Sequence, residues 1–158
     1  MGKRSAQPIR AGQLAGTQVK IVGVYNDALR EYVTITNRGT LAQPLGGWVL
    51  ATLRGERFYP FPEDLILLPN MEVTIHSGEG VLDMPAGALR DRRLVWTHEQ
   101  VWNNRGDVAV LFDAEGIEVD RCAYPHERIL GSATRRPLRL LREGETWRIL
   151  LLGQREKE

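Results

Sequence analysis

Residues 101–112 constrain the fold of this chain more than any other segment, because they combine an aromatic anchor, a tight turn and a strand. Trp102 is followed by the turn Asn103-Asn104-Arg105-Gly106-Asp107, and residues 108–112 then form an alternating run that we interpret as a strand. Asn and Gly adopt positive φ at little cost, so this composition is typical of a turn that leads into a strand. The segment predicts a structural signature rather than a catalytic one.

Short runs with a period of two recur through most of the chain. We expect strands at residues 19–25, 31–36, 48–53, 57–61, 72–76, 108–112 and 117–124. Gly, Asn and Asp separate these runs at intervals of about 8–12 residues, which is the spacing of a β-sandwich or barrel. No stretch of residues 18–125 has the pattern of a long amphipathic helix.

The composition is that of a soluble globular domain. Of the 158 residues, 42% are hydrophobic and 26% charged, and the net charge of +1 does not by itself predict a polyanionic partner. Cys122 is the one cysteine, which excludes an intramolecular disulfide and a cysteine-based metal cluster. The chain has no apolar run of about 20 residues and no apolar segment behind its basic start, so we expect neither membrane insertion nor a secretory signal in it. The sequence does not decide the compartment: it is compatible with a cytoplasmic protein and, if a signal was removed, with an extracytoplasmic one.

Five short motifs, in the same order, resemble those of the lamin tail domain family. They are Glu31-Tyr32-Val33-Thr34-Ile35-Thr36-Asn37, Leu45-Gly46-Gly47-Trp48, the Phe58 to Val73 region with Phe61-Pro62 and Leu68-Pro69, the Val101 to Leu111 segment, and Asp113 to Asp120. Asn70 and Gly46 depart from the family pattern, but both residue types tolerate turn geometry. The pattern is similar to that of prokaryotic-type members with a C-terminal extension.

This resemblance implies an all-β fold, an immunoglobulin-like antiparallel β-sandwich, and the strand count from the residues agrees with it. We expect three parts: a flexible basic arm at residues 1–17, a lamin-tail-like domain at 18–126, and an arginine-rich extension at 127–158 that packs on the sandwich or on a second copy. The structural signature residues are Trp48, Trp102, Asn103, Asn104, Gly106 and Asp107.

The aromatic residues allow two interpretations. Trp48 and Trp102 sit beside turns at strand edges, which favours core packing over ligand stacking. Trp96 and Trp147 fit core packing and a stacking surface for sugars or bases equally well. The tripeptide Arg105-Gly106-Asp107 also spells an adhesion motif, but turn chemistry explains it.

Catalysis is disfavoured, and we expect no cofactor and no enzyme. His76, His98 and His126 lack metal-ligand spacing, and no serine lies in a nucleophile motif. Cys122 lies in an alternating run, which favours a buried structural thiol. A metal-dependent hydrolase with an unusual site is kept as a third hypothesis only.

The extension after residue 126 carries the candidate contact residues. Arg128, Arg135, Arg136, Arg139 and Arg142 occur with no acidic residue between them, and they are the candidate contacts to a partner or to nucleic acid. The apolar segment after them, with Trp147, Ile149 and Leu151, is the candidate interface. Its exposure would be unfavourable, so it should pack on its own sandwich, on a second copy or on a partner.

Two secondary structures compete for this extension. In the first, residues 137–141 and 146–152 form a hairpin that buries Leu138, Leu140 and Trp147 and exposes Arg139 and Arg148. In the second, the segment is a helix, but Gly144 and Thr146 disfavour it. We therefore favour an added C-terminal hairpin or strand.

The sequence favours a non-catalytic interaction or scaffolding module that binds a protein or cell-envelope partner. Self-association as a homodimer through the C-terminal strand is one form of this hypothesis. Carbohydrate contact through exposed tryptophans is a variant. The alternative is DNA binding through the arginine-rich segment and the basic N-terminal arm.

Overall fold

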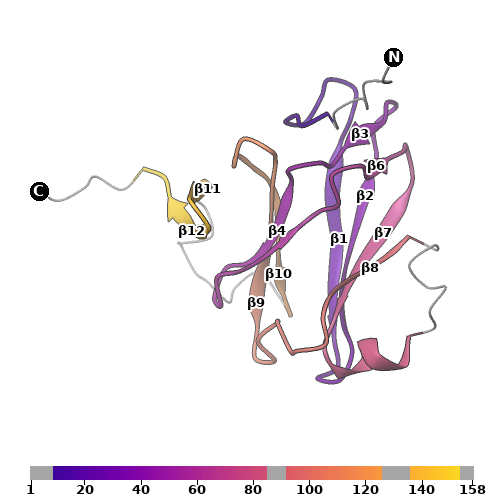
Figure 1. The fold of residues 1–158 in the computed structure, drawn as a ribbon, viewed down its shortest axis with the longest axis vertical. Coiled ribbons are helices and arrows are strands. Elements are labelled where there is room, and N and C mark those ends of the chain that lie inside the picture. The colour runs from indigo at the N-terminus through magenta and orange to yellow at the C-terminus, as the bar shows by residue number, and fades with distance from the viewer. Residues whose placement is uncertain (1–8, 85–91, 126–135, 154–158) are drawn as a thin grey trace, which may run out of the picture.

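A computed structural model describes residues 9–84, 92–125 and 136–153 (Figure 1). The strands are β1 (Val19–Asn26), β2 (Glu31–Asn37), β3 (Gln43–Pro44), β4 (Val49–Thr52), β5 (Arg57–Pro60), β6 (Ile66–Leu67), β7 (Glu72–Ser77), β8 (Arg93–Thr97), β9 (Asp107–Phe112), β10 (Glu118–Tyr124), β11 (Leu138–Glu143) and β12 (Thr146–Leu151). One 3-10 helix, η1 (Glu79–Asp83), lies between β7 and β8. Within these three ranges, no helix has the length and apolar character needed to cross a membrane.

Two four-stranded sheets face each other. The first has the order β1-β2-β7-β8 and the second the order β10-β9-β4-β5. A core cluster between them includes Ile35, Trp48, Leu111 and Trp102, all nearly inaccessible to solvent. The all-β, immunoglobulin-like sandwich expected from the sequence is therefore confirmed.

One strand pair differs from a wholly antiparallel sandwich. β8 runs parallel to β7, with Thr74 opposite Arg93 and His76 opposite Val95. A parallel neighbour needs a long crossover rather than a tight hairpin, and the connection that contains η1 provides that length. β8 was not among the predicted strands, because its short sequence Arg-Leu-Val-Trp-Thr lacks both clear alternation and flanking turn residues.

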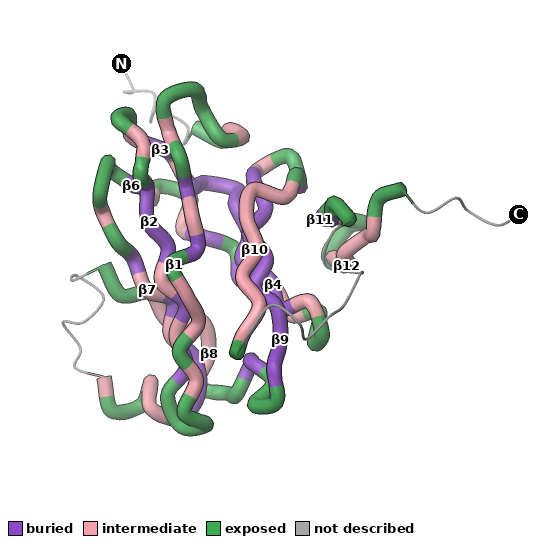
Figure 2. The backbone as a smooth tube through the Cα atoms, turned by 180° about the vertical axis from the view of Figure 1, so that it is seen from behind, coloured by how far each residue is buried: buried purple, intermediate pink, exposed green. Residues whose placement is uncertain are grey.

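The two central strands of the second sheet, β4 and β9, are buried on both faces. Every residue of β4 and of β9 is buried (Figure 2), so the strand predicted at residues 108–112 is present and is covered on both faces. One set of side chains points into the core between the sheets. The other set, which includes Val49, Val110 and Phe112, forms a second cluster on the outer face of this sheet.

The C-terminal hairpin covers that outer face. β11 and β12 pair antiparallel around the turn at Gly144, which has φ +60°. Leu138 and Leu140 are buried in the second cluster, and Trp147 is half-buried against it, whereas Arg139 and Arg148 are exposed. The predicted hairpin is confirmed, and the helical alternative is wrong.

A buried carboxylate ties the first sheet to the segment before β9. Glu31 begins β2 and is almost fully buried. Its Oε1 accepts hydrogen bonds from the Ser77 hydroxyl (2.9 Å) and from the Val101 backbone N–H (2.8 Å), and its Oε2 accepts one from the Trp102 N–H (3.2 Å). Trp102 is thereby held in the core, where its ring makes edge contacts with Trp96 and Tyr124.

Glu31→Gln should destabilise the fold by about 1–3 kcal/mol, because an amide group replaces one acceptor oxygen opposite buried backbone donors. Glu72→Gln on the exposed side of β7 is the matched control and should change stability by less than about 0.5 kcal/mol. Urea unfolding of the two variants measures both values. Equal effects of the two substitutions would contradict the role given to Glu31.

Candidate interaction surface

The signature turn before β9 is bound into the fold by its own side chains. The Asp107 carboxylate is buried and accepts hydrogen bonds from the backbone N–H groups of Arg54 (3.0 Å) and Val108 (2.8 Å). Asn103 accepts one from the Arg105 N–H, and Asn104 is hydrogen-bonded to Asn26 and Gln100. Gly106 has φ +131°, which only glycine adopts without strain. Since the Asp107 carboxylate is fully engaged, the tripeptide is not available to a receptor.

None of the four tryptophans is exposed: Trp48 and Trp102 are buried, and Trp96 and Trp147 are half-buried. Trp48 is buried and donates its indole N–H to the Ala11 carbonyl (2.6 Å). Trp96 is half-buried between Tyr59 and Trp102. Trp147 packs edge-on against Phe58, at 5.7 Å between ring centroids. This arrangement gives no support to carbohydrate contact through exposed tryptophans.

The arginines of the extension divide into engaged and free side chains. Arg142 donates to the Gly47 carbonyl (2.6 Å) and lies over the Trp147 ring, 5.1 Å from its centroid. Burial, with the charge of Arg10, lowers the pKa of Arg142 from its usual value. Arg136 and Arg139 are exposed, and their side chains make no hydrogen bond or ion pair with the described residues. Arg128 and Arg135 lie outside the described residues.

A polar clamp on β10 holds the start of β11. Glu118 and Arg121 form a mostly buried ion pair. Arg121 also donates to the Arg136 carbonyl (2.6 Å), and Glu118 accepts a hydrogen bond from the Leu138 N–H (2.9 Å). A register shift between Glu118 and Asp120 is the bulge that brings residues three apart to one side of the strand. The clamp could not be predicted from the sequence, because strand alternation alone places these two side chains on opposite faces.

A shallow hollow of about 450 Å³ lies beside this clamp, between β10 and the hairpin. Its apolar part includes Ile117 and Leu152, which are 47% and 40% exposed, and Arg139 stands at its rim. An isolated antiparallel bridge between Ile117 and Arg139 joins β11 to the turn before β10. The hollow is therefore continuous with the exposed end of the hairpin.

The hairpin also has a free strand edge. β12 pairs only with β11 among the strands of the three described ranges. The Leu152 N–H donates a hydrogen bond to the Pro137 carbonyl (2.8 Å). Hydrogen-bonded residues alternate along an antiparallel strand, so the backbone groups of Leu150, Arg148 and Thr146 also point toward β11. Trp147, Ile149 and Leu151 alternate with them: their side chains face the sandwich, and their backbone N–H and C=O groups point to the open edge. These three residues are the ones the sequence marked as an interface.

Metal or nucleophile chemistry finds no support on this surface or elsewhere in the described ranges. They contain no group of three or more His, Cys, Asp or Glu side chains that could hold a metal ion. Cys122 is half-buried on β10 rather than fully buried as expected. His98 is exposed, His76 lies on β7, and His126 falls outside the described residues.

Gly116 is the closest contact between the sandwich and the hairpin. It has φ +82°, its carbonyl accepts the Leu140 N–H (2.9 Å), and a Cβ at this position would lie 2.4 Å from the Leu140 carbonyl oxygen. Gly116→Ala should therefore lower the free energy of unfolding by at least about 1 kcal/mol more than Gly144→Ala. Gly144 has a similar φ of +60° but open space around it, so its substitution controls for backbone strain alone. Denaturant unfolding compares the two, and equal losses would show that the hairpin does not dock closely at Gly116.

The sequence model of the Lamin Tail Domain family matches residues 13–126. No curated protein matches the chain. The matched span contains both sheets of the sandwich and ends before the hairpin of β11 and β12.

Proposed function

The chain belongs to the lamin tail domain family of immunoglobulin-like interaction domains, and we propose that it is a non-catalytic module that binds a protein partner by strand addition at β12. The observation that carries this proposal is the free edge formed by the backbone groups of Trp147, Ile149 and Leu151. An extended segment that pairs there would become the third strand of the hairpin sheet.

In the part of the chain that the structure describes, the β12 edge lacks the usual protection against strand pairing. Natural edge strands are blunted by proline, bulges, inward charges or a covering loop. The β12 sequence Thr-Trp-Arg-Ile-Leu-Leu contains no proline, and its pairing with β11 runs without a register shift. Its one charge, Arg148, is on the outward face and is paired with Glu143 (3.3 Å), not directed along the edge. An edge of this kind favours a partner strand.

The surroundings of the edge indicate what the partner strand carries. The outward face of the hairpin combines the half-buried Leu141 and Leu150 with the exposed Arg139 and Arg148. A partner strand whose outward side chains include both apolar and acidic residues complements both features. We therefore propose an extended, acidic and apolar segment of a protein as the ligand of this edge.

Ile149→Pro tests the proposal, because proline removes the one outward N–H at the centre of the edge and no hydrogen bond within the hairpin. Ile149→Ala is the matched control: it loses a similar side chain but keeps the N–H. Peptides selected from a displayed random library on the full chain are then measured against each variant. We expect at least about tenfold weaker binding to Ile149→Pro than to Ile149→Ala.

Equal affinity of the selected peptides for both variants would refute strand addition at β12. Thermal unfolding of both variants shows whether the sandwich is intact. Sedimentation at high protein concentration identifies the case in which the added strand comes from a second copy. In that case a dimer should form with the native chain and with Ile149→Ala, but not with Ile149→Pro.

DNA binding is the second candidate, supported by the acid-free stretch at residues 128–142 and by the exposure of Arg136 and Arg139. Arg142 contributes less to it, since its guanidinium is held by Gly47 and Trp147. If most of the five arginines met phosphates, a plot of log K against log salt would have a slope of about −4. Fluorescence anisotropy with a mixed-sequence duplex measures this slope. A flat salt response, or no binding at low salt, would eliminate DNA as the partner.

A further inference from the structure

A row of ring side chains crosses the outer face of the first sheet, on the opposite side of the molecule's core from the hairpin. Strand register places Tyr25 on β1 opposite Tyr32 on β2, and Tyr32 opposite His76 on β7. The rings of Tyr25 and Tyr32 are stacked at 4.9 Å between centroids, and those of Tyr32 and His76 lie 5.2 Å apart. The contacts between sheets do not use these rings, because they are on the face turned away from the core.

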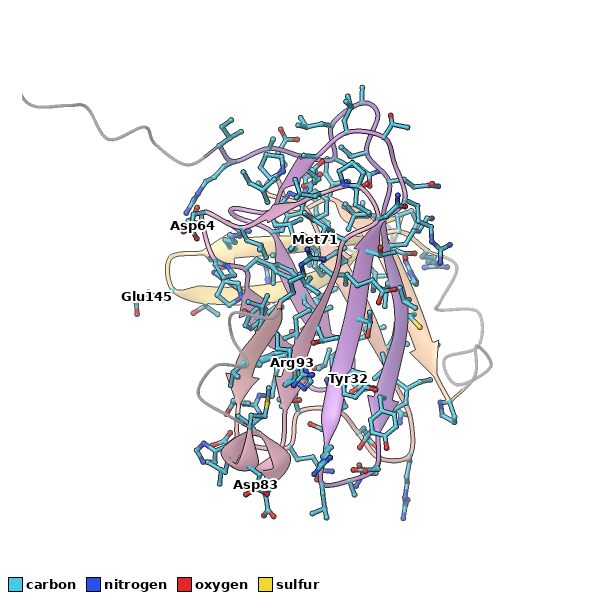
Figure 3. All side chains as sticks on the ribbon, turned by 90° about the vertical axis from the view of Figure 1, so that its right-hand side faces the viewer. Tyr32, Asp64, Met71, Asp83, Arg93 and Glu145 are labelled. Carbon is cyan, nitrogen blue, oxygen red and sulfur yellow. The ribbon has the colours of Figure 1, made fainter. Side chains whose placement is uncertain are left out.

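The row ends in a pocket of about 320 Å³ between this sheet face and η1. Tyr32 and His76 line it from the sheet, Arg93 from β8, and Val81 and Met84 from η1 and its end. Figure 3 shows Tyr32 and Arg93 on the same face, with Asp83 below them on η1. The pocket thus joins ring surfaces and apolar side chains to a cationic rim.

The positive charge at the rim exceeds the negative charge that faces it. Arg93 and Arg30 line the pocket, and neither guanidinium forms an ion pair with an acid of the described ranges. Glu31 also lines the pocket, but its carboxylate is turned inward to Ser77 and the backbone of residues 101 and 102. Asp83 is the remaining acid at the rim.

Arg93 is the better placed of the two cations. Arg30 also acts on Asp27, whose pKa it helps to lower after the backbone hydrogen bonds of that carboxylate. Arg93 lies next to the half-buried His76, and burial followed by the charge of Arg93 lowers the pKa of that imidazole. The lowered pKa favours the uncharged form of the His76 imidazole, whose Nε2 is hydrogen-bonded to the Thr74 hydroxyl (2.7 Å). The ring therefore presents a fixed, uncharged surface beside a cation.

We propose that this pocket binds a small planar ring that carries one carboxylate or phosphate, with the ring against Tyr32 and His76 and the anionic group on Arg93. The volume suits a single ring with its substituent and is at the lower end of the range for small-molecule sites. A planar guanidinium is the preferred partner for either anion. The site is independent of the β12 edge, since the two surfaces are on different sheets.

The probes are phenyl phosphate and benzoate, with benzyl alcohol and inorganic phosphate as controls for the ring without charge and the anion without a ring. Proton–carbon NMR of the histidine rings in the full chain locates binding, because His76 lies in the pocket and the exposed His98 does not. We expect at least one of the two aryl anions to shift the His76 resonances in a saturable way. Either control should bind at least about tenfold more weakly than that probe.

Arg93→Gln should weaken the aryl anion at least about tenfold, whereas Arg92→Gln, the exposed neighbour outside the pocket, should change its affinity less than about twofold. The proposal would be overturned if neither aryl anion shifted the His76 resonances of the native chain. It would also be overturned if the two arginine substitutions had equal effects on affinity. If benzyl alcohol bound as tightly as the aryl anions, the role of Arg93 would be overturned. If inorganic phosphate bound as tightly as the aryl anions, the role of the rings would be overturned. Ile149→Pro should leave the affinity unchanged, so this result is separate from the fate of the strand-addition proposal.

Discussion

The apolar outer face of the second sheet is the constraint on which the rest of this structure depends. A sandwich of two layers normally leaves the outer face of each sheet polar, but Val49, Val110 and Phe112 make the outer face of this sheet apolar. Side chains of this size each lose about 1.5–3 kcal/mol of stabilisation when left in water. A third layer is therefore required, and the hairpin of β11 and β12 provides it from the same chain.

The contacts that hold this third layer come from separate parts of the sandwich. Gly116 allows the backbone of β11 to approach, the Glu118–Arg121 pair receives the start of β11, and the Gly47 carbonyl binds Arg142. Both strands of a two-stranded layer are edge strands, so β12 has one edge that no strand of the described ranges covers. The hairpin of β11 and β12 thus accounts for both features: it covers the apolar face, and it has the free edge. The hairpin lies beyond the residues matched by the family model, so the proposed binding edge is specific to this chain's extension.

The fold could be predicted from the sequence because the local signals agree with one another. Turn residues at regular spacing identified most strands, and Gly144 between two leucine-rich runs identified the hairpin. Local signals do not predict features that depend on distant partners. The parallel pairing of β8, the bulge that joins Glu118 to Arg121, and the inward turn of the Glu31 carboxylate each need the tertiary register. Arg142 illustrates the limit most clearly: its charge suggested a contact for a partner, whereas the structure uses it against Gly47 and Trp147.

β11 covers the second sheet with one specific face. Leu140 and Leu141 are neighbours on that strand, but Leu140 is buried in the second cluster, whereas Leu141 belongs to neither core cluster and faces outward. Urea unfolding of Leu140→Ala and Leu141→Ala in the full chain compares the two faces directly. We predict that Leu140→Ala lowers the free energy of unfolding by about 2–4 kcal/mol and Leu141→Ala by less than about 1 kcal/mol. Equal and small losses would contradict the account, since they would mean that the hairpin does not cover the sandwich.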